Sequence, residues 1–233
     1  MKIALLGYGK MGQVIERIAT ERGHEIVLKK DEFNTYDGLS NADVAIDFSV
    51  PMAAVDNISS CFHAKVPVVS GTTGWLEHYD EMEALCKELN GGFISSSNFS
   101  LGVNIFFGLN EYLAKLMAPF DSYKVEMEEI HHTQKLDAPS GTAISLAKGV
   151  IENSSYTNWT LEEAKENEIH IEAKRTGTVP GTHTVTYNSV VDSIEIKHTA
   201  HNREGFALGA VIAAEWLAGK HGIFTMKDVL NLK

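Results

Sequence analysis

Lys2-Ile3-Ala4-Leu5-Leu6-Gly7-Tyr8-Gly9-Lys10-Met11-Gly12 is the stretch that decides the fold of the N-terminal part of the chain. Its apolar run, residues 3–6, is short, continuous and ended by glycine, as in a buried strand of a parallel sheet. Apolar residues at helical spacing follow, and they predict a helix from Lys10 to Arg22 that ends before Gly23. The glycines form G-x-G-x-x-G between this strand and this helix. We therefore expect a turn that binds the pyrophosphate of a dinucleotide at the helix N-terminus, in preference to a tight turn without a ligand.

The alternation of strands and helices continues over roughly the first hundred residues. Further strands are predicted at HEIVLKK (24–30), ADVAIDFS (42–49), VPVVSGTTG (66–74) and GGFISSSNFS (91–100), the last two running into loops. Helices are predicted at 53–64 and 77–89. This order is typical of a right-handed, doubly wound parallel sheet of the Rossmann type. We assign residues 1–99 to a dinucleotide-binding domain in an α/β chain.

The pattern changes after residue 100. A helix is predicted at 103–117, and SYKVEMEEIHH (122–132) reads as a half-buried strand with Tyr123, Val125, Met127 and Ile130 on its apolar side. A helix follows KLDAPSG, and the segments 169–177 and 181–201 are rich in alternating β-formers. We expect an α+β domain that binds the substrate over residues 100–205. The last helix, Phe206–Leu217, lies in a C-terminal segment of about 206–233 that we expect to return to the first domain.

Composition narrows the function classes. The 233 residues carry 20 Lys and Arg against 31 Asp and Glu, a formal net charge of −11, which disfavours nucleic acid and anionic membranes as partners. No window of 18 apolar residues occurs, and the apolar run at residues 3–6 is too short for a signal peptide. Two cysteines, Cys61 and Cys86, are too few for a disulfide framework, so we expect a reducing, cytoplasmic compartment.

The end of the second predicted strand should read the adenosine ribose of the dinucleotide. Lys29 and Lys30 suit the 2′-phosphate of NADPH, whereas Asp31 suits the 2′-hydroxyl of NADH. A solvated run of charges is the third possibility, so the sequence leaves NADH and NADPH both open. The loops 71–74 and 96–99 follow two other strands at their carboxyl ends, where ligands bind in such sheets.

The densest cluster of reactive side chains is EEIHHTQKLDAPSGTA, residues 128–143. His131 can give or take a proton near neutral pH, Lys135 adds a positive charge, and Ser140-Gly141-Thr142 opens a helix whose free N–H groups suit a carboxylate. Because adjacent histidines on a strand point to opposite faces, we expect no metal site. Other polar groups, whose roles the sequence leaves open, are Lys174, Arg175, His198, His201 and Arg203.

Together these motifs resemble the 4-hydroxy-tetrahydrodipicolinate reductase family, also called dihydrodipicolinate reductase, of lysine biosynthesis. EIHHTQKLDAPSGTA (129–143) is close to the family signature E-x-H-H-x-x-K-x-D-A-P-S-G-T-A, and GYGKMG, DFSVP, GTTG and SNFSLGVN stand around it in the family's order. The chain is shorter than many members between Lys30 and Ala42. The pair Lys29-Lys30 replaces an acidic-then-basic pair seen in some members, which leaves the nucleotide preference open.

The resemblance implies an enzyme that uses NADH or NADPH to reduce a cyclic dicarboxylate and that assembles as a homotetramer through its C-terminal sheet. It implies His131 as the proton donor, Lys135 as a second one, and substrate contacts at His132, Lys135, Ser140, Gly141 and Thr142. It also implies a nucleotide site at Gly7, Tyr8, Gly9, Lys10, Met11, Gly12, Lys30, Gly71, Thr72, Thr73, Ser96, Ser97, Asn98 and Phe99. Two alternatives remain: another two-domain dehydrogenase of amino-acid metabolism, and a redox-sensing module that binds NAD without turnover.

Overall fold

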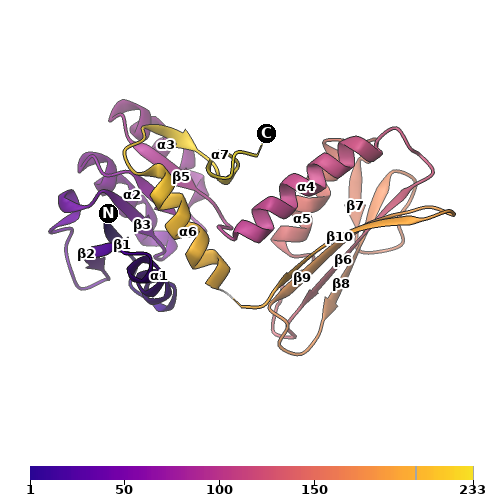
Figure 1. The fold of residues 1–233 in the computed structure, drawn as a ribbon, viewed down its shortest axis with the longest axis horizontal. Helices are drawn as coiled ribbons and strands as arrows, with labels where there is room; N and C mark the ends of the chain where they lie inside the picture. The colour runs from indigo at the N-terminus through magenta and orange to yellow at the C-terminus, as the bar shows by residue number, and fades with distance from the viewer. Residues whose placement is uncertain (203, 233) are drawn as a thin grey trace. The chain divides into compact units, whose positions relative to one another are not determined.

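The computed structural model of the chain describes residues 1–202 and 204–232 (Figure 1). These residues form two compact units. One unit runs from Met1 to Leu101 and resumes at Glu204, and the other begins at Gly102. Each has its own sheet and its own apolar core.

The first unit is built on a parallel six-stranded sheet in the order β11-β5-β4-β3-β1-β2. Its strands are β1 (Lys2–Leu6), β2 (Glu25–Lys30), β3 (Val44–Asp47), β4 (Val68–Ser70), β5 (Gly92–Ser95) and β11 (Gly222–Phe224). Short runs of apolar residues buried on both faces form β1, β3 and β4. The expected Rossmann-type parallel sheet is therefore confirmed, with strands shorter than the sequence segments assigned to them.

Helices cover both faces of this sheet. They are α1 (Lys10–Glu21), α2 (Pro51–His63), α3 (Tyr79–Glu88), α6 (Glu204–Leu217) and α7 (Met226–Val229), with 3₁₀ turns η1 (Leu39–Asn41) and η2 (Leu76–His78). Ile3 and Leu5 of β1 pack on one face with α1 and α6, whereas Ala4 and Leu6 pack on the other with α2 and α3. The alternation of side chains along one strand thus creates the two-sided core of a doubly wound fold.

The second unit packs two helices against one mixed sheet in the order β10-β9-β6-β8-β7 (Figure 1). The strands are β6 (Lys124–His131), β7 (Asn158–Thr160), β8 (Glu168–Arg175), β9 (Gly181–Asn188) and β10 (Ser193–Ala200), and the helices are α4 (Leu101–Met117) and α5 (Gly141–Ile151). Strand β6 is central, parallel to β8 and antiparallel to β9. Phe106 of α4 and Leu146 of α5 cover Val125 and Met127 of β6. The α+β class of this unit matches the expectation.

One expectation about local structure is wrong. Ile130 does not continue the buried side of β6, because strict alternation from Val125 and Met127 places Glu129 and His131 there instead. The last predicted helix ends at Leu217 in the structure, as expected. The chain then turns at Gly219 with a positive φ of 75°, and β11, which the sequence did not predict, joins the sheet edge beside β5. None of the helices in the described ranges is long and apolar enough to cross a membrane.

Candidate functional site

The glycine turn after β1 is shaped by backbone contacts on one side and open space on the other. A Cβ atom on Gly7 would lie 2.2 Å from the carbonyl oxygen of Phe48, and one on Gly12 would lie 2.3 Å from the carbonyl oxygen of Gly7. A Cβ on Gly9 would have no atom within 4 Å. Gly9 is the N-cap residue of α1, with no side-chain cap. The first N–H groups of α1 therefore lie beside an exposed glycine, an arrangement that suits an anion.

The loop after β4 is held in place by Asp47, the buried last residue of β3. Its carboxylate accepts hydrogen bonds from Ser49 Oγ (2.7 Å), Asn57 Nδ2 (2.9 Å), Ser70 Oγ (2.8 Å) and Thr72 Oγ1 (2.7 Å). Burial raises the pKa of Asp47, and these four hydrogen bonds oppose that rise. The Thr72 hydroxyl also accepts from the backbone N–H of Ser49 at 2.8 Å, so it stabilises the loop itself.

The predicted nucleotide-binding residues in the loops after β4 and β5 differ in whether their side chains are available to a ligand. Gly71 contacts the Phe48 ring so closely that a Cβ would lie 2.2 Å from its Cζ atom. Phe99 is buried, and its ring lies 5.9 Å from that of Phe48. Ser96 Oγ accepts from the N–H of Asn98 at 3.2 Å and donates to its carbonyl at 2.9 Å, which shapes the turn after β5. A nucleotide would therefore meet the backbone of these loops more than the Thr72 hydroxyl or the Phe99 ring.

The two lysines at the end of β2 have partners within the chain. Lys29 forms an ion pair with Glu16 at 2.5 Å and lies 5.0 Å from the centre of the Tyr8 ring. Lys30 donates to the carbonyl oxygens of Asp31 and Asn34, each at 3.0 Å. Lys30 also lies 4.8 Å from the centre of the Tyr36 ring. The charge of Lys29 is thus balanced by Glu16, whereas the contacts of Lys30 described here are with carbonyl oxygens and an aromatic ring.

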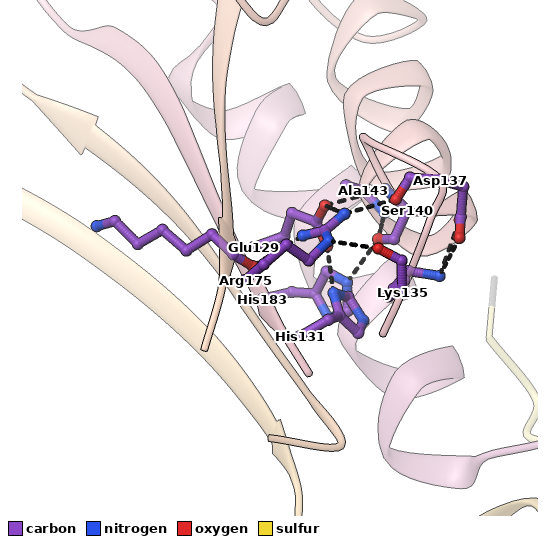
Figure 2. A network of polar contacts seen from close by, with 9 residues as sticks. Glu129, His131, Lys135, Asp137, Ser140, Ala143, Arg175 and His183 are labelled. Carbon is purple, nitrogen blue, oxygen red and sulfur yellow. Dashed lines mark hydrogen bonds and ion pairs between the residues drawn. The ribbon is translucent and has the colours of Figure 1, made fainter. Parts of the chain in front are cut away.

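In the second unit, a charged network lies at the C-terminal end of β6 (Figure 2). Glu129 is 0% exposed, and its two carboxylate oxygens have different partners. Oε1 accepts from Arg175 Nη2 at 2.9 Å and from the backbone N–H of Ser140 at 3.2 Å, while Oε2 contacts His131 Nδ1. Arg175 compensates a buried charge that would otherwise be costly.

His131 lies between this carboxylate and a second histidine, His183 of β9. Their ring centres are 5.1 Å apart in an edge-on arrangement. Burial lowers the pKa of His131, Glu129 raises it, and Lys135 and Arg175 lower it further. Burial and the neighbouring His131 lower the pKa of His183 to about 4, so His183 is neutral at physiological pH. His183 Nε2 lies 3.0 Å from Ser140 Oγ.

Lys135 lies in the loop between β6 and α5, and its ammonium is paired with Asp137. Nζ lies 2.8 Å from each carboxylate oxygen, and this contact lowers the pKa of Asp137. The Asp137 side chain is 61% exposed and that of Lys135 is 21% exposed. Because such partly exposed ion pairs contribute little free energy, another carboxylate can replace Asp137 at small cost.

Helix α5 begins directly behind this loop. Ser140 is its N-cap, and the Oγ atom accepts from the N–H of Ala143 at 3.2 Å. Gly141 is exposed at the first helical position, and a Cβ there would have no atom within 4 Å. Thr142 follows and is partly buried. The first turn of α5 therefore offers accessible N–H donors on the same segment as Lys135.

Glu129, His131 and His183 each offer a ligand atom within 4.8 Å of the others, which is a donor set that a divalent cation can use. Arg175 brings a permanent positive charge onto the same carboxylate, and this charge opposes a cation there. The expectation that no metal binds stays a prediction.

The sequence did not lead us to predict Glu129 and His183 as members of this network, and it left the role of Arg175 open. Glu129 was detectable, because the period-2 pattern of β6 puts it in the buried row. His183 reaches the network because β9 pairs with β6 and sets it opposite Glu129. His132 lies just past the end of β6 and is partly buried. His198 packs near the Phe106 ring, at 6.1 Å between centres, and Arg203 lies outside the described residues.

Comparisons with known proteins cover nearly the whole chain. Residues 1–99 match the family described as "Dihydrodipicolinate reductase, N-terminus", and residues 102–230 match "Dihydrodipicolinate reductase, C-terminus". A 4-hydroxy-tetrahydrodipicolinate reductase of Christiangramia forsetii is 59% identical, over 99% of this chain and 98% of its own. A 4-hydroxy-tetrahydrodipicolinate reductase of Methanoregula boonei is 35% identical, over 100% of this chain and 98% of its own. Among solved structures, dipicolinate-bound dihydrodipicolinate reductase from Paenisporosarcina sp. TG-14 shares the fold, with a TM-score of 0.76, 23% identity and 97% of both chains covered.

Proposed function

The chain belongs to the dihydrodipicolinate reductase family, and from this membership we propose that it reduces 4-hydroxy-tetrahydrodipicolinate to tetrahydrodipicolinate, with loss of water, in diaminopimelate and lysine biosynthesis. The observation that carries the proposal is the match of both family halves, together with 59% identity to a reductase of that name over almost the full length. The enzyme is an oxidoreductase that uses a pyridine nucleotide.

The first unit fits such a nucleotide. The open space at Gly9 and the N-terminus of α1 suit a pyrophosphate, with Gly7, Tyr8, Lys10, Met11 and Gly12 forming the turn. The remaining proposed nucleotide contacts are Lys30, Gly71, Thr72, Thr73, Ser96, Ser97, Asn98 and Phe99. We propose that both NADH and NADPH serve. The support is Lys30, whose ammonium meets carbonyl oxygens and has a charge to offer a 2′-phosphate.

The second unit fits a cyclic dicarboxylate. Lys135 would exchange its Asp137 partner for a substrate carboxylate, and the N–H donors of Gly141 and Thr142 would hold the same or the second carboxylate. Ser140 would support them as the N-cap of α5, since its own N–H donates to Glu129, and His132 is the remaining proposed substrate contact. These contacts orient the ring, and orientation lowers the barrier to reaction. Loss of the 4-hydroxyl as water leaves a conjugated ring ready for reduction.

His131 is the proposed proton donor. A bound reduced nicotinamide supplies the hydride, and the ring carbon that becomes electron-rich must then take a proton. Burial lowers the pKa of His131 below its usual value, and the Glu129 carboxylate beside its Nδ1 opposes that fall and favours the protonated ring. Lys135 lies in the loop that follows as a second proposed donor. The residues thus divide the work: Lys135 and the start of α5 bind charge, and His131 delivers a proton.

We also propose a homotetramer and a cytoplasmic location. The eight-residue strand β10 is at the edge of the second sheet and is largely exposed, which leaves backbone groups ready to pair with another copy. Cys61 and Cys86 are free and buried, in keeping with a reducing compartment. Light scattering of the purified protein and fractionation of cells test the two statements. A monomer at micromolar concentration would reject the first.

Steady-state kinetics with the freshly cyclised substrate and either nucleotide tests the reaction directly. We expect substrate-dependent oxidation of NADH and of NADPH, with dipicolinate as an inhibitor that competes with the substrate. Binding of nucleotide without turnover would favour a redox-sensing module. Turnover of a different substrate of amino-acid metabolism, and not of this cyclic dicarboxylate, would favour another dehydrogenase.

A further inference from the structure

Arg175 occupies a central place in the second unit that the reaction scheme above does not use. It is the last residue of β8, and the parallel pairing of β8 with β6 sets it opposite His131. Its guanidinium reaches the loop after β6 through two backbone carbonyls, with Nε donating to Lys135 at 3.3 Å and Nη2 donating to Asp137 at 2.5 Å. One side chain therefore holds both residues that flank the tip of the Lys135 loop.

The same guanidinium holds Glu129. Nη2 lies 2.9 Å from Oε1, and the other oxygen of that carboxylate contacts His131 Nδ1. Glu129 is fully buried, so its position is set by these contacts and by the N–H of Ser140. Arg175 is thus joined to the proton donor through one intervening side chain, and to the carboxylate-binding lysine through the loop backbone (Figure 2).

The orientation of His131 follows from this arrangement. Nδ1 is directed to Glu129, while Nε2 is directed to Gly181, where a Cβ atom would lie only 3.0 Å away. A carboxylate on one ring nitrogen fixes the tautomer and leaves the other nitrogen to act. Four groups from different elements face His131: Glu129 on β6, Lys135 in the loop, Arg175 on β8 and His183 on β9. Glu129 is the anion among them.

We propose that Arg175 is a positioning residue that couples the two halves of the reaction in this unit: through Glu129 it sets the charge and orientation of His131, and through the carbonyls of Lys135 and Asp137 it fixes the loop that binds the substrate carboxylate. This inference rests on the proposed function for the identity of the substrate. The coupling itself concerns only contacts within the chain, so it is testable without turnover.

Two substitutions separate the charge role from the loop role. Arg175→Lys keeps a positive charge but cannot span two carbonyls and a carboxylate at once, because an ammonium lacks the planar fork of donors. Glu129→Gln keeps the shape and an acceptor for Ser140 but removes the negative charge beside His131. Arg175→Ala removes both functions of the arginine. Lys174→Ala is the matched control, since it removes a cation from the adjacent position that pairs with Glu128 and Glu172 at the surface.

The pKa of His131, read by NMR titration of its ring protons, is the readout that a merely structural role would not move. Glu129→Gln should lower it, since the anion that favours the protonated ring is lost. Arg175→Ala should raise it, since a nearby cation is lost, and Arg175→Lys should leave it close to that of the wild type. Because His131 must be protonated to act, the fall of kcat at high pH should move in the same directions.

The affinity for dipicolinate, measured by calorimetry with nucleotide present, reports on the position of the Lys135 loop. We expect Arg175→Ala and Arg175→Lys both to weaken it roughly tenfold or more, with Glu129→Gln and Lys174→Ala near the wild-type value. Should Arg175→Ala not fold, Arg175→Lys and Glu129→Gln carry the test. An unmoved His131 titration in Glu129→Gln, or unchanged dipicolinate affinity in Arg175→Lys, overturns the coupling. A wild type that binds dipicolinate but turns over no substrate overturns the proposed reaction and leaves these readouts intact.

Discussion

The glycine turn of the first unit and the His131 network of the second unit are built in opposite ways. The turn lies within residues 7–12, and its shape depends on missing side chains: Gly7 and Gly12 press against backbone, and Gly9 leaves space. The network depends on polar and charged side chains from three strands and a loop, spread from Glu129 to His183. One site is local and made of backbone, and the other is long-range and made of charge.

This difference determines how each site should fail. A nucleotide site formed from N–H groups depends on open space beside the backbone more than on side-chain charge, so added bulk is what should damage it most. The network holds a buried carboxylate balanced by Arg175, so loss of charge balance should damage it more than loss of volume. Substitutions chosen on this basis should separate nucleotide affinity from substrate affinity and from the proton-transfer step.

The largest effect is expected at His131. His131→Ala should lower kcat by roughly 10²–10⁴-fold, the usual contribution of a general acid, with nucleotide affinity nearly unchanged. Initial-rate kinetics and a fluorescence titration of NADH check the two halves of this statement. His170→Ala, which removes a partly buried histidine opposite Glu126 on the same sheet, is the control and should retain wild-type turnover. Activity of His131→Ala within a few-fold of wild type would contradict its role.

Intermediate effects are expected from a matched pair of glycine substitutions. Gly9→Ala and Gly141→Ala both add a methyl group where no atom lies within 4 Å, and neither glycine has a positive φ, so thermal stability should hardly change. We expect Gly9→Ala to raise the KM for nucleotide roughly ten- to hundredfold, because the methyl group would lie where the pyrophosphate approaches. Gly141→Ala should instead raise the KM for substrate.

The proposed difference between the two units is wrong if Gly9→Ala and Gly141→Ala do not raise different KM values, one for nucleotide and one for substrate. Both KM values rising together in each variant would mean that the two glycines act on one property, such as overall stability. Thermal melts of both proteins distinguish that outcome, since a shared loss of stability would appear as a lowered Tm in each.

The smallest effect is expected at Lys30. Lys30→Ala should lower the affinity for NADPH several-fold and leave the affinity for NADH unchanged. The reason is that a surface cation contributes a modest, screened attraction to the extra phosphate of NADPH. Titrations of both nucleotides at two salt concentrations check this, with the difference shrinking at high salt. Lys29→Ala is the control, since Lys29 is already paired with Glu16. Equal weakening of both nucleotides would reject the assignment of Lys30.

The sequence predicted the local features well because their causes are local. The Rossmann-type sheet followed from short apolar runs and helical spacing, and the 129–143 signature pointed to His131 and Lys135. Arg175 and His183 come from strands paired with β6, and no spacing within the sequence sets that register. Ile130 was placed wrongly because hydrophobicity was preferred over strict alternation, whereas an ion pair made burial of Glu129 possible. The small strand β11 was missed because three residues carry too weak a pattern.

The central claim is that the loop after β6 presents Lys135 to a substrate carboxylate while His131 delivers the proton, and steady-state kinetics of Lys135→Arg and Lys135→Ala test it most directly. Charge pairing acts in ground and transition states alike, so its loss raises KM, whereas proton assistance acts only in the transition state, so its loss lowers kcat. We predict that Lys135→Ala changes both constants. Lys135→Arg, which keeps the charge but does not release a proton near neutral pH, should recover KM in part and leave kcat low. If Lys135→Ala changes neither constant, the loop does not bind the substrate and the account of the second unit is wrong.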